Sequence, residues 1–229
     1  MCFSFPTALA SYLLALSAGI FALVTRQVVL GCLIFSYAQM QLSELLIWKG
    51  IDTNNTKLNR IGTSFGKYLL ATHVFAIGLG IILSIVFISK KKLKFTDFIP
   101  LVIGIIFFLF ITVYYYLPGG YSNETHPAKN CKREEGCKSG DNRLLWPYPH
   151  RWYLMSYILS MIIVLIWIKP NMSKLVFFLI FTLTFVGTYV IYPKTVGSVW
   201  CWLASFISPL IVLAGWGVVR GMPNSDILT

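Results

Sequence analysis

Long apolar runs constrain this sequence more than any other feature. Seven stretches of about twenty residues, at 6–24, 28–48, 67–89, 97–117, 152–168, 175–192 and 196–219, are nearly free of charge. A helix of that length crosses the roughly 30 Å hydrocarbon core of a bilayer. Only 12% of the residues are charged, well below the share in soluble proteins. We therefore expect one all-α domain, residues 1–229, that forms a polytopic integral membrane bundle of about seven transmembrane helices.

The placement of positive charge predicts the orientation. No Lys or Arg precedes the first run, and Arg26 follows it directly. The other connections on that side of the membrane carry Lys90, Lys91, Lys92, Lys94, Lys169, Lys174 and Arg220. Short loops rich in Lys and Arg usually face the cytosol. More Lys and Arg fall on the opposite side, but six of them lie in the long loop 118–151 among acidic residues. We expect the N-terminus outside, this loop outside and the C-terminus in the cytosol.

The net charge of +11 raises the question of nucleic-acid binding. The basic residues lie in short segments between apolar runs, whereas a nucleic-acid site needs one basic patch or stripe. Positive charges beside membrane helices attract anionic lipid headgroups. We expect membrane lipids as partners and no nucleic acid.

The expected outer loop contains groups that are modified in oxidising compartments. Cys131 and Cys137 would close a short disulfide ring there, and two free thiols are the alternative. Asn54 and Asn123 each begin an Asn-x-Thr triplet, which accepts a glycan if the chain enters a eukaryotic secretory membrane. A third triplet, at Asn171, lies on the expected inner side and should stay unmodified. We predict the disulfide and, in such a membrane, the two outer glycans.

Glu44 is the one carboxylate inside an apolar run. Steps of three and four residues place it on one helix face with Tyr37, Gln41 and Trp48. A charge on that face should look into the bundle, because exposure to lipid is costly. The expected topology brings residues of other helices to the same depth, and the resulting polar pocket would consist of Tyr37, Gln41, Glu44, Trp48, His73, Trp200, Cys201 and Trp202.

A structural interpretation of these residues stays open beside the functional one. Trp and Tyr concentrate at membrane interfaces in all kinds of membrane proteins, and Glu44 lies about one turn from the end of its run. For Glu44 and His73 the two interpretations have similar support, because ionisable residues inside a membrane often serve function. Sequence motifs of zinc proteases, serine hydrolases and phosphate-binding loops are absent.

Three motifs together resemble a known family. They are Met1-Cys2-Phe3-Ser4 at the start, Gln41-Leu42-Ser43-Glu44 followed by Trp48, and Ser198-Val199-Trp200-Cys201-Trp202. The combination is similar to a family of small polytopic membrane proteins of unknown function, found in bacteria and giant DNA viruses. The resemblance implies a shared helical fold and draws attention to these positions, but it implies no activity.

Two cysteines in these motifs fall on the same side of the membrane if the N-terminus is outside. Cys2 and Cys201 could then form a disulfide, or join Glu44 and His73 as ligands of a metal such as zinc. Independent packing of each thiol is the third alternative, and the one we favour.

Three functions remain open. The favoured one is a non-enzymatic protein that binds or passes a small solute, lipid or ion through the pocket. Glu44 should then face the bundle interior within hydrogen-bond reach of run 67–89 or run 196–219, with His73 and Trp200 as the preferred neighbours. The second is a membrane-embedded, lipid-modifying enzyme that uses Glu44 and His73 as acid and base or as metal ligands. The third is a passive structural component whose polar residues only fix helix packing. The sequence predicts neither a cofactor nor an oligomeric state.

Overall fold

Helices make up most of the chain that the computed structural model describes, which is residues 4–116, 124–127, 144–147, 151–165, 183–192 and 195–220. The longer helices are α1 (Phe5–Val24), α2 (Val28–Asp52), α3 (Thr56–Leu83), α4 (Ile99–Tyr116), α5 (Arg151–Leu165) and α7 (Val196–Arg220). Residues 183–191 are also helical. A π-helical turn, Ser84–Ser89, and a 3-10 turn, Phe95–Phe98, lie between α3 and α4. The fold is therefore the all-α bundle that the sequence predicts.

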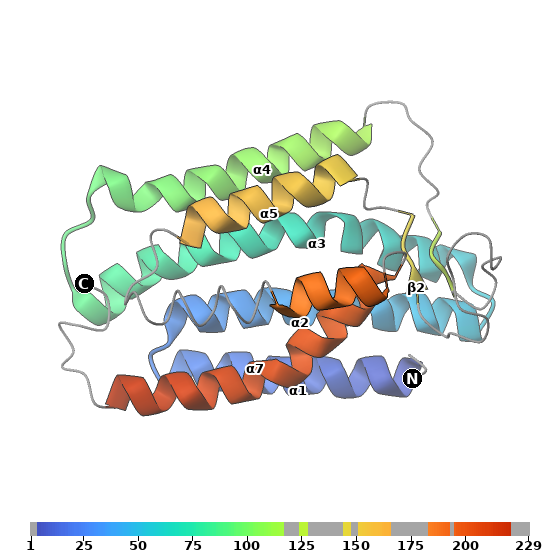
Figure 1. The fold of residues 1–229 in the computed structure, drawn as a ribbon, viewed down its shortest axis with the longest axis horizontal. Coiled ribbons are helices and arrows are strands. Elements are labelled where there is room, and N and C mark those ends of the chain that lie inside the picture. The colour runs from blue at the N-terminus through green and yellow to red at the C-terminus, as the bar shows by residue number, and fades with distance from the viewer. Residues whose placement is uncertain are drawn as a thin grey trace.

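The helices run along the long axis of the molecule, and consecutive ones are antiparallel (Figure 1). One end holds the start of α1, the turn between α2 and α3, and a small antiparallel ribbon formed by β1 (His126–Pro127) and β2 (Leu144–Leu145). We call it the ribbon end. The other end, the lysine end, holds the link from α3 to α4 with Lys90–Lys94.

Five helical segments of the described chain are long and apolar enough to cross a membrane. They are Phe5–Val24, Val28–Asp52, Thr72–Ser89, Phe95–Val113 and Ser198–Trp216. Large apolar side chains on the outer face of α4, such as Val102, Ile106 and Val113, are exposed, as in helices that face lipid. The structure is that of a multi-helix, membrane-type bundle. The expected runs 152–168 and 175–192 extend beyond the described residues, so the number of seven stays a prediction.

Two helices extend beyond the apolar runs that predicted them. α2 continues past Trp48 to Asp52, and α3 begins at Thr56, well before residue 67. The Asn55 side chain caps α3 by accepting a hydrogen bond from the Leu58 N–H at 3.1 Å. Hydropathy marks the part of a helix that lies in hydrocarbon, whereas the cap marks where the helix begins. The prediction of residue 67 as the start of α3 was therefore too late.

Glycines allow α2, α3 and α4 to approach closely. A Cβ atom on Gly62 would lie 2.9 Å from the carbonyl oxygen of Ser43, whose hydroxyl donates to the Gly62 carbonyl at 2.7 Å. A Cβ on Gly78 would lie 2.5 Å from the backbone nitrogen of Leu101. Small residues at such contacts are typical of helices that associate in membranes.

α7 bends about half-way along its length (Figure 1). Pro209 lies inside this helix and has no N–H for the preceding turn, which is the usual cause of such a bend. Beyond the bend, the Gln27 side chain donates to the Val212 carbonyl at 3.0 Å. This hydrogen bond ties the tight turn between α1 and α2 to α7.

Candidate functional site

The polar face of α2 is turned into the bundle. The exposed fractions of Tyr37, Gln41, Glu44 and Trp48 are 5%, 0%, 1% and 5%. These side chains share one face because α2 is a continuous helix through all four positions. The structure thus places these four residues in the interior and away from lipid.

Glu44 has polar neighbours on α7. The Ser198 hydroxyl lies beside the carboxyl group, and Cys201 is near enough to interact with it electrostatically. Neither Glu44 Oε1 nor Ser198 Oγ completes a well-formed hydrogen bond to any residue that the structure describes. The structure also shows no hydrogen bond from Glu44 to His73 or Trp200, the two partners that the sequence favoured, within the same described part of the chain.

His73 contacts a different set of residues. Its Nδ1 atom lies 3.0 Å from Tyr157 Oη on α5. Its ring meets that of Tyr37 edge-on, with 4.2 Å between centroids. His73 and Tyr157 are both fully buried, and His73 Nε2 has no hydrogen-bond partner among the described residues. No sequence pattern singled out Tyr157, which lies near the middle of α5.

The three residues of the predicted pocket that lie on α7 do not all face the same part of the bundle. Trp200 faces inward, where its Nε1 donates to Thr184 Oγ1 at 3.3 Å and its ring lies 5.5 Å from that of Tyr37. Cys201 is buried in the same cluster of side chains. Trp202 is half-buried and belongs to another cluster, at the ribbon end with Trp48. Of these three residues, Trp200 and Cys201 therefore lie in the interior with Tyr37, and Trp202 does not.

The ribbon is fastened over its end of the bundle by residues that sequence reasoning missed. Asn59 on α3 donates to the Thr125 carbonyl at 2.9 Å and accepts from the Thr125 N–H at 3.0 Å. The Thr63 and Thr125 hydroxyls share a further hydrogen bond of 2.8 Å. Leu144 of β2 is fully buried in a cluster with Trp48. The sequence signal, an Asn and a Thr one helical turn apart, is too common to have been singled out.

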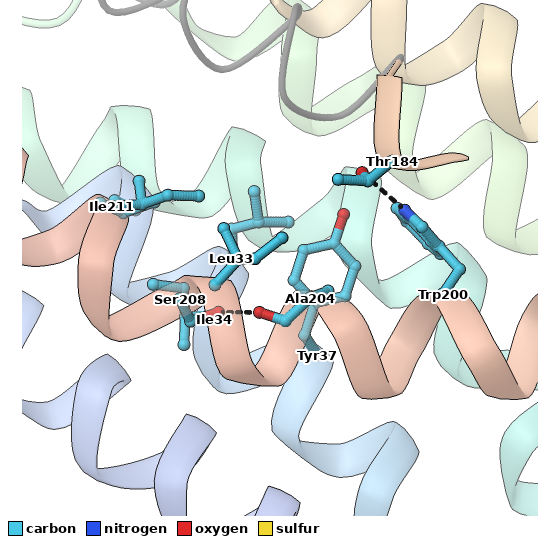
Figure 2. Close-up of a pocket in the computed structure, with 10 residues that line it drawn as sticks. Leu33, Ile34, Tyr37, Thr184, Trp200, Ala204, Ser208 and Ile211 are labelled. Atoms are coloured by element: carbon cyan, nitrogen blue, oxygen red, sulfur yellow. Dashed lines mark hydrogen bonds between the residues drawn. The ribbon is translucent and has the colours of Figure 1, made fainter. Parts of the chain in front are cut away.

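A cavity adjoins this polar interior on the side of the lysine end (Figure 2). It is lined by Leu30, Leu33, Ile34, Tyr37, Thr184, Trp200, Ala204, Ile207, Ser208 and Ile211. Its enclosed volume is about 40 Å³. Tyr37 and Trp200 are the two predicted site residues in its wall; Gln41, Glu44 and His73 do not line it.

No protein family, curated protein or solved structure matches this chain.

The other predicted sites fall partly outside the described chain. Cys2, Cys131, Cys137 and Asn123 are not among the described residues, so the loop disulfide and the glycan at Asn123 stay predictions. Cys201 is a free thiol, and because Cys2 is not described, the three alternatives for this pair stay predictions. The Asn54 side chain is exposed, and its backbone adopts the left-handed conformation (φ 53°) in the turn after α2. Across the described part of the chain, no three His, Cys, Asp or Glu side chains gather as a metal site would require.

The arrangement suits hydrogen bonding or coordination by several oxygen atoms at once. Both amide atoms of Gln41 are buried without a hydrogen-bond partner among the described residues, one helical turn from Glu44. A polar group in an apolar interior destabilises the fold unless another group contacts it. Glu44, Gln41 and Ser198 together can therefore contact a small guest through a carboxylate, an amide and a hydroxyl.

Proposed function

We propose that this chain is a membrane protein that binds or passes a small monovalent cation at Glu44, between α2 and α7. The observation that carries the proposal is that Glu44 Oε1 and both amide atoms of Gln41, one helical turn apart, are buried without a hydrogen-bond partner among the described residues. A cation in contact with both would offset the desolvation of the Glu44 charge, which is otherwise costly in a membrane interior.

The donor atoms favour a hard cation. Glu44, Gln41 and Ser198 offer oxygen atoms, which alkali and alkaline-earth ions prefer, whereas zinc prefers nitrogen and sulfur. A single carboxylate balances a single positive charge. We therefore favour a monovalent ion over the zinc site that the sequence left open.

The two alternative functions have less support. An acid–base enzyme would need Glu44 and His73 to act on one substrate, yet His73 is joined to Tyr157. A purely structural role for Glu44 is also less favoured, because its Oε1 atom forms no hydrogen bond to another helix within the described residues. The polar residues that do join α2 to α3 are paired: Ser43 donates to the Gly62 carbonyl, and the Ser36 and Thr72 hydroxyls lie 2.7 Å apart.

We further propose that the ribbon end faces outside and the lysine end faces the cytosol. Lys90, Lys91, Lys92 and Lys94 are exposed in the short link between α3 and α4. Clusters of this kind are retained on the cytosolic side. Glu44 would then lie in the outer half of the membrane, nearer to the ribbon.

Thermal unfolding of the purified protein in detergent tests the cation site. Sodium and potassium chloride are compared with choline chloride at equal ionic strength, and one of the two should raise the melting temperature by about 5–10 °C near saturation. Glu44→Gln should keep the helical circular dichroism spectrum and lose the shift, because the amide carries no charge. Asp52→Asn is the matched control, since Asp52 is exposed at the end of the same helix. The absence of a shift with both ions, or a full shift in Glu44→Gln, would overturn the proposal.

A further inference from the structure

We propose that the cavity between α2, α7 and the helical residues 183–191 binds one lipid-like amphiphile, with its polar end at Tyr37 and its apolar chain directed toward the lysine end. This second site does not depend on a cation at Glu44, because Glu44 does not line the cavity.

The walls of the cavity change from apolar to polar along its length (Figure 2). α2 runs from the lysine end toward the ribbon end and contributes Leu30 and Leu33 first, then Tyr37. α7 runs the opposite way, so Trp200 lies at the polar end and Ile211 at the apolar end. A ligand that matches both ends must itself have a polar and an apolar part.

The Tyr37 hydroxyl supplies the hydrogen-bonding group at the polar end. Tyr37 is 5% exposed, and its Oη atom completes no well-formed hydrogen bond to a described residue, although the Tyr157 side chain lies near it. Figure 2 shows this hydroxyl directed toward Thr184 and Trp200, across the cavity. The Ser208 hydroxyl already donates to the Ala204 carbonyl at 2.6 Å. Tyr37 can therefore donate to a hydroxyl, carbonyl or carboxylate oxygen of a ligand.

The lining favours hydrocarbon over water at the other end. A water molecule needs two to four polar partners, whereas the lysine-end wall is formed by aliphatic side chains such as Leu30, Ile207 and Ile211. The enclosed volume of about 40 Å³ is smaller than an alkyl chain, so the chain would fill it in part and extend through the open side of the cavity. Burial of apolar surface there favours an alkyl chain, and the surrounding membrane is a source of such chains.

Quenching of tryptophan fluorescence tests this site, because Trp200 forms part of its wall. The probe is 6-bromohexan-1-ol, a short amphiphile whose bromine quenches indoles that it touches. We expect saturable quenching in the wild-type protein, assigned to Trp200 by its loss in Trp200→Phe. Ala204→Leu should abolish it by filling the cavity, whereas Ala214→Leu, an exposed position on the same helix, should not.

Tyr37→Phe provides a second variant that keeps the ring and removes the hydroxyl. Loss of one hydrogen bond should weaken binding of the bromoalkanol about 2- to 10-fold and should leave binding of 1-bromohexane unchanged. Glu44→Gln should retain the quenching, which separates this site from the cation site. Non-saturable quenching, equal in the wild type and Ala204→Leu, would show simple partition into the micelle and overturn the proposal.

Discussion

His73 and Tyr157 form a fully buried hydrogen-bonded pair that joins α3 to α5 at the level of individual side chains. Water cannot reach either group, so the bond is made in an apolar interior. The Tyr37 ring contacts both the His73 and the Trp200 rings, and the Trp200 ring also lies 6.4 Å from that of Tyr157. Four helices thus contribute one side chain each to a contiguous aromatic and polar group.

Tyr157→Phe should destabilise the protein by removing that hydrogen bond. The His73 Nδ1 atom would remain buried without a partner, which costs about 1–3 kcal/mol. The lowered midpoint should be visible in thermal unfolding in detergent. Tyr189→Phe is the control, because Tyr189 is 49% exposed. Equal midpoints for the two variants would show that the His73–Tyr157 bond contributes nothing to stability.

Helical spacing predicts which side chains share a helix face. The part of the candidate site that lies on α2 could therefore be predicted from the sequence. Tyr37, Gln41, Glu44 and Trp48 are local to one helix, so their common burial follows from the sequence pattern. The partners of Glu44 and His73 come from α7 and α5, far along the chain. The rotation of those helices depends on packing, which no spacing rule specifies.

Among the elements, the ribbon is attached at Thr125, where Asn59 makes two hydrogen bonds and Thr63 makes a third. Asn59→Leu removes both hydrogen bonds to Thr125, and one of them uses the Thr125 N–H itself. Two buried hydrogen bonds at about 1 kcal/mol each correspond to roughly 30-fold more frequent opening. Hydrogen exchange at the Thr125 amide should accelerate by about that factor. Lys57→Leu, at an exposed position on the same helix, should leave the rate unchanged.

Close helix contact makes one glycine far less replaceable than another. Gly78→Ala places a methyl group against the Leu101 backbone, so α3 and α4 must separate and the protein should lose about 1–3 kcal/mol. Gly187→Ala meets nothing within 4 Å and should be neutral or slightly stabilising. Unfolding in sodium dodecyl sulfate, followed by circular dichroism, gives the comparison. Similar curves for the two variants would contradict the close packing of α3 on α4.

For the whole molecule, the apolar runs predict the class of fold but not the full length of its helices. The all-α bundle follows from runs that hydrocarbon demands. The polar first turns of α3 carry Asn59 and Thr63, whose burial depends on the ribbon folding back over them. Such a contact between distant segments leaves no periodic signal, so hydropathy misses it.

Labelling of intact cells tests the orientation of the molecule. In a background without other reactive cysteines, an impermeant thiol reagent should label Asn123→Cys and leave Lys91→Cys unlabelled, because the lysine end is expected in the cytosol. Permeabilised cells should label both, which shows that each site is reactive. The reverse pattern in intact cells would place the ribbon end, and with it Glu44, near the cytosol.

The burial of Thr125 has a consequence for the timing of biosynthesis. Thr125 is the third residue of the triplet that begins at Asn123, and its hydroxyl is fully enclosed once Asn59 and Thr63 hold the ribbon. In a secretory membrane, the glycosyl transferase must therefore reach the triplet before the ribbon docks. Asn54 lies on an exposed turn, so it stays accessible to the transferase after folding. The glycan occupancy at Asn123 relative to that at Asn54 would then report how long the ribbon stays undocked. Slower docking in Asn59→Leu would raise occupancy at Asn123 alone.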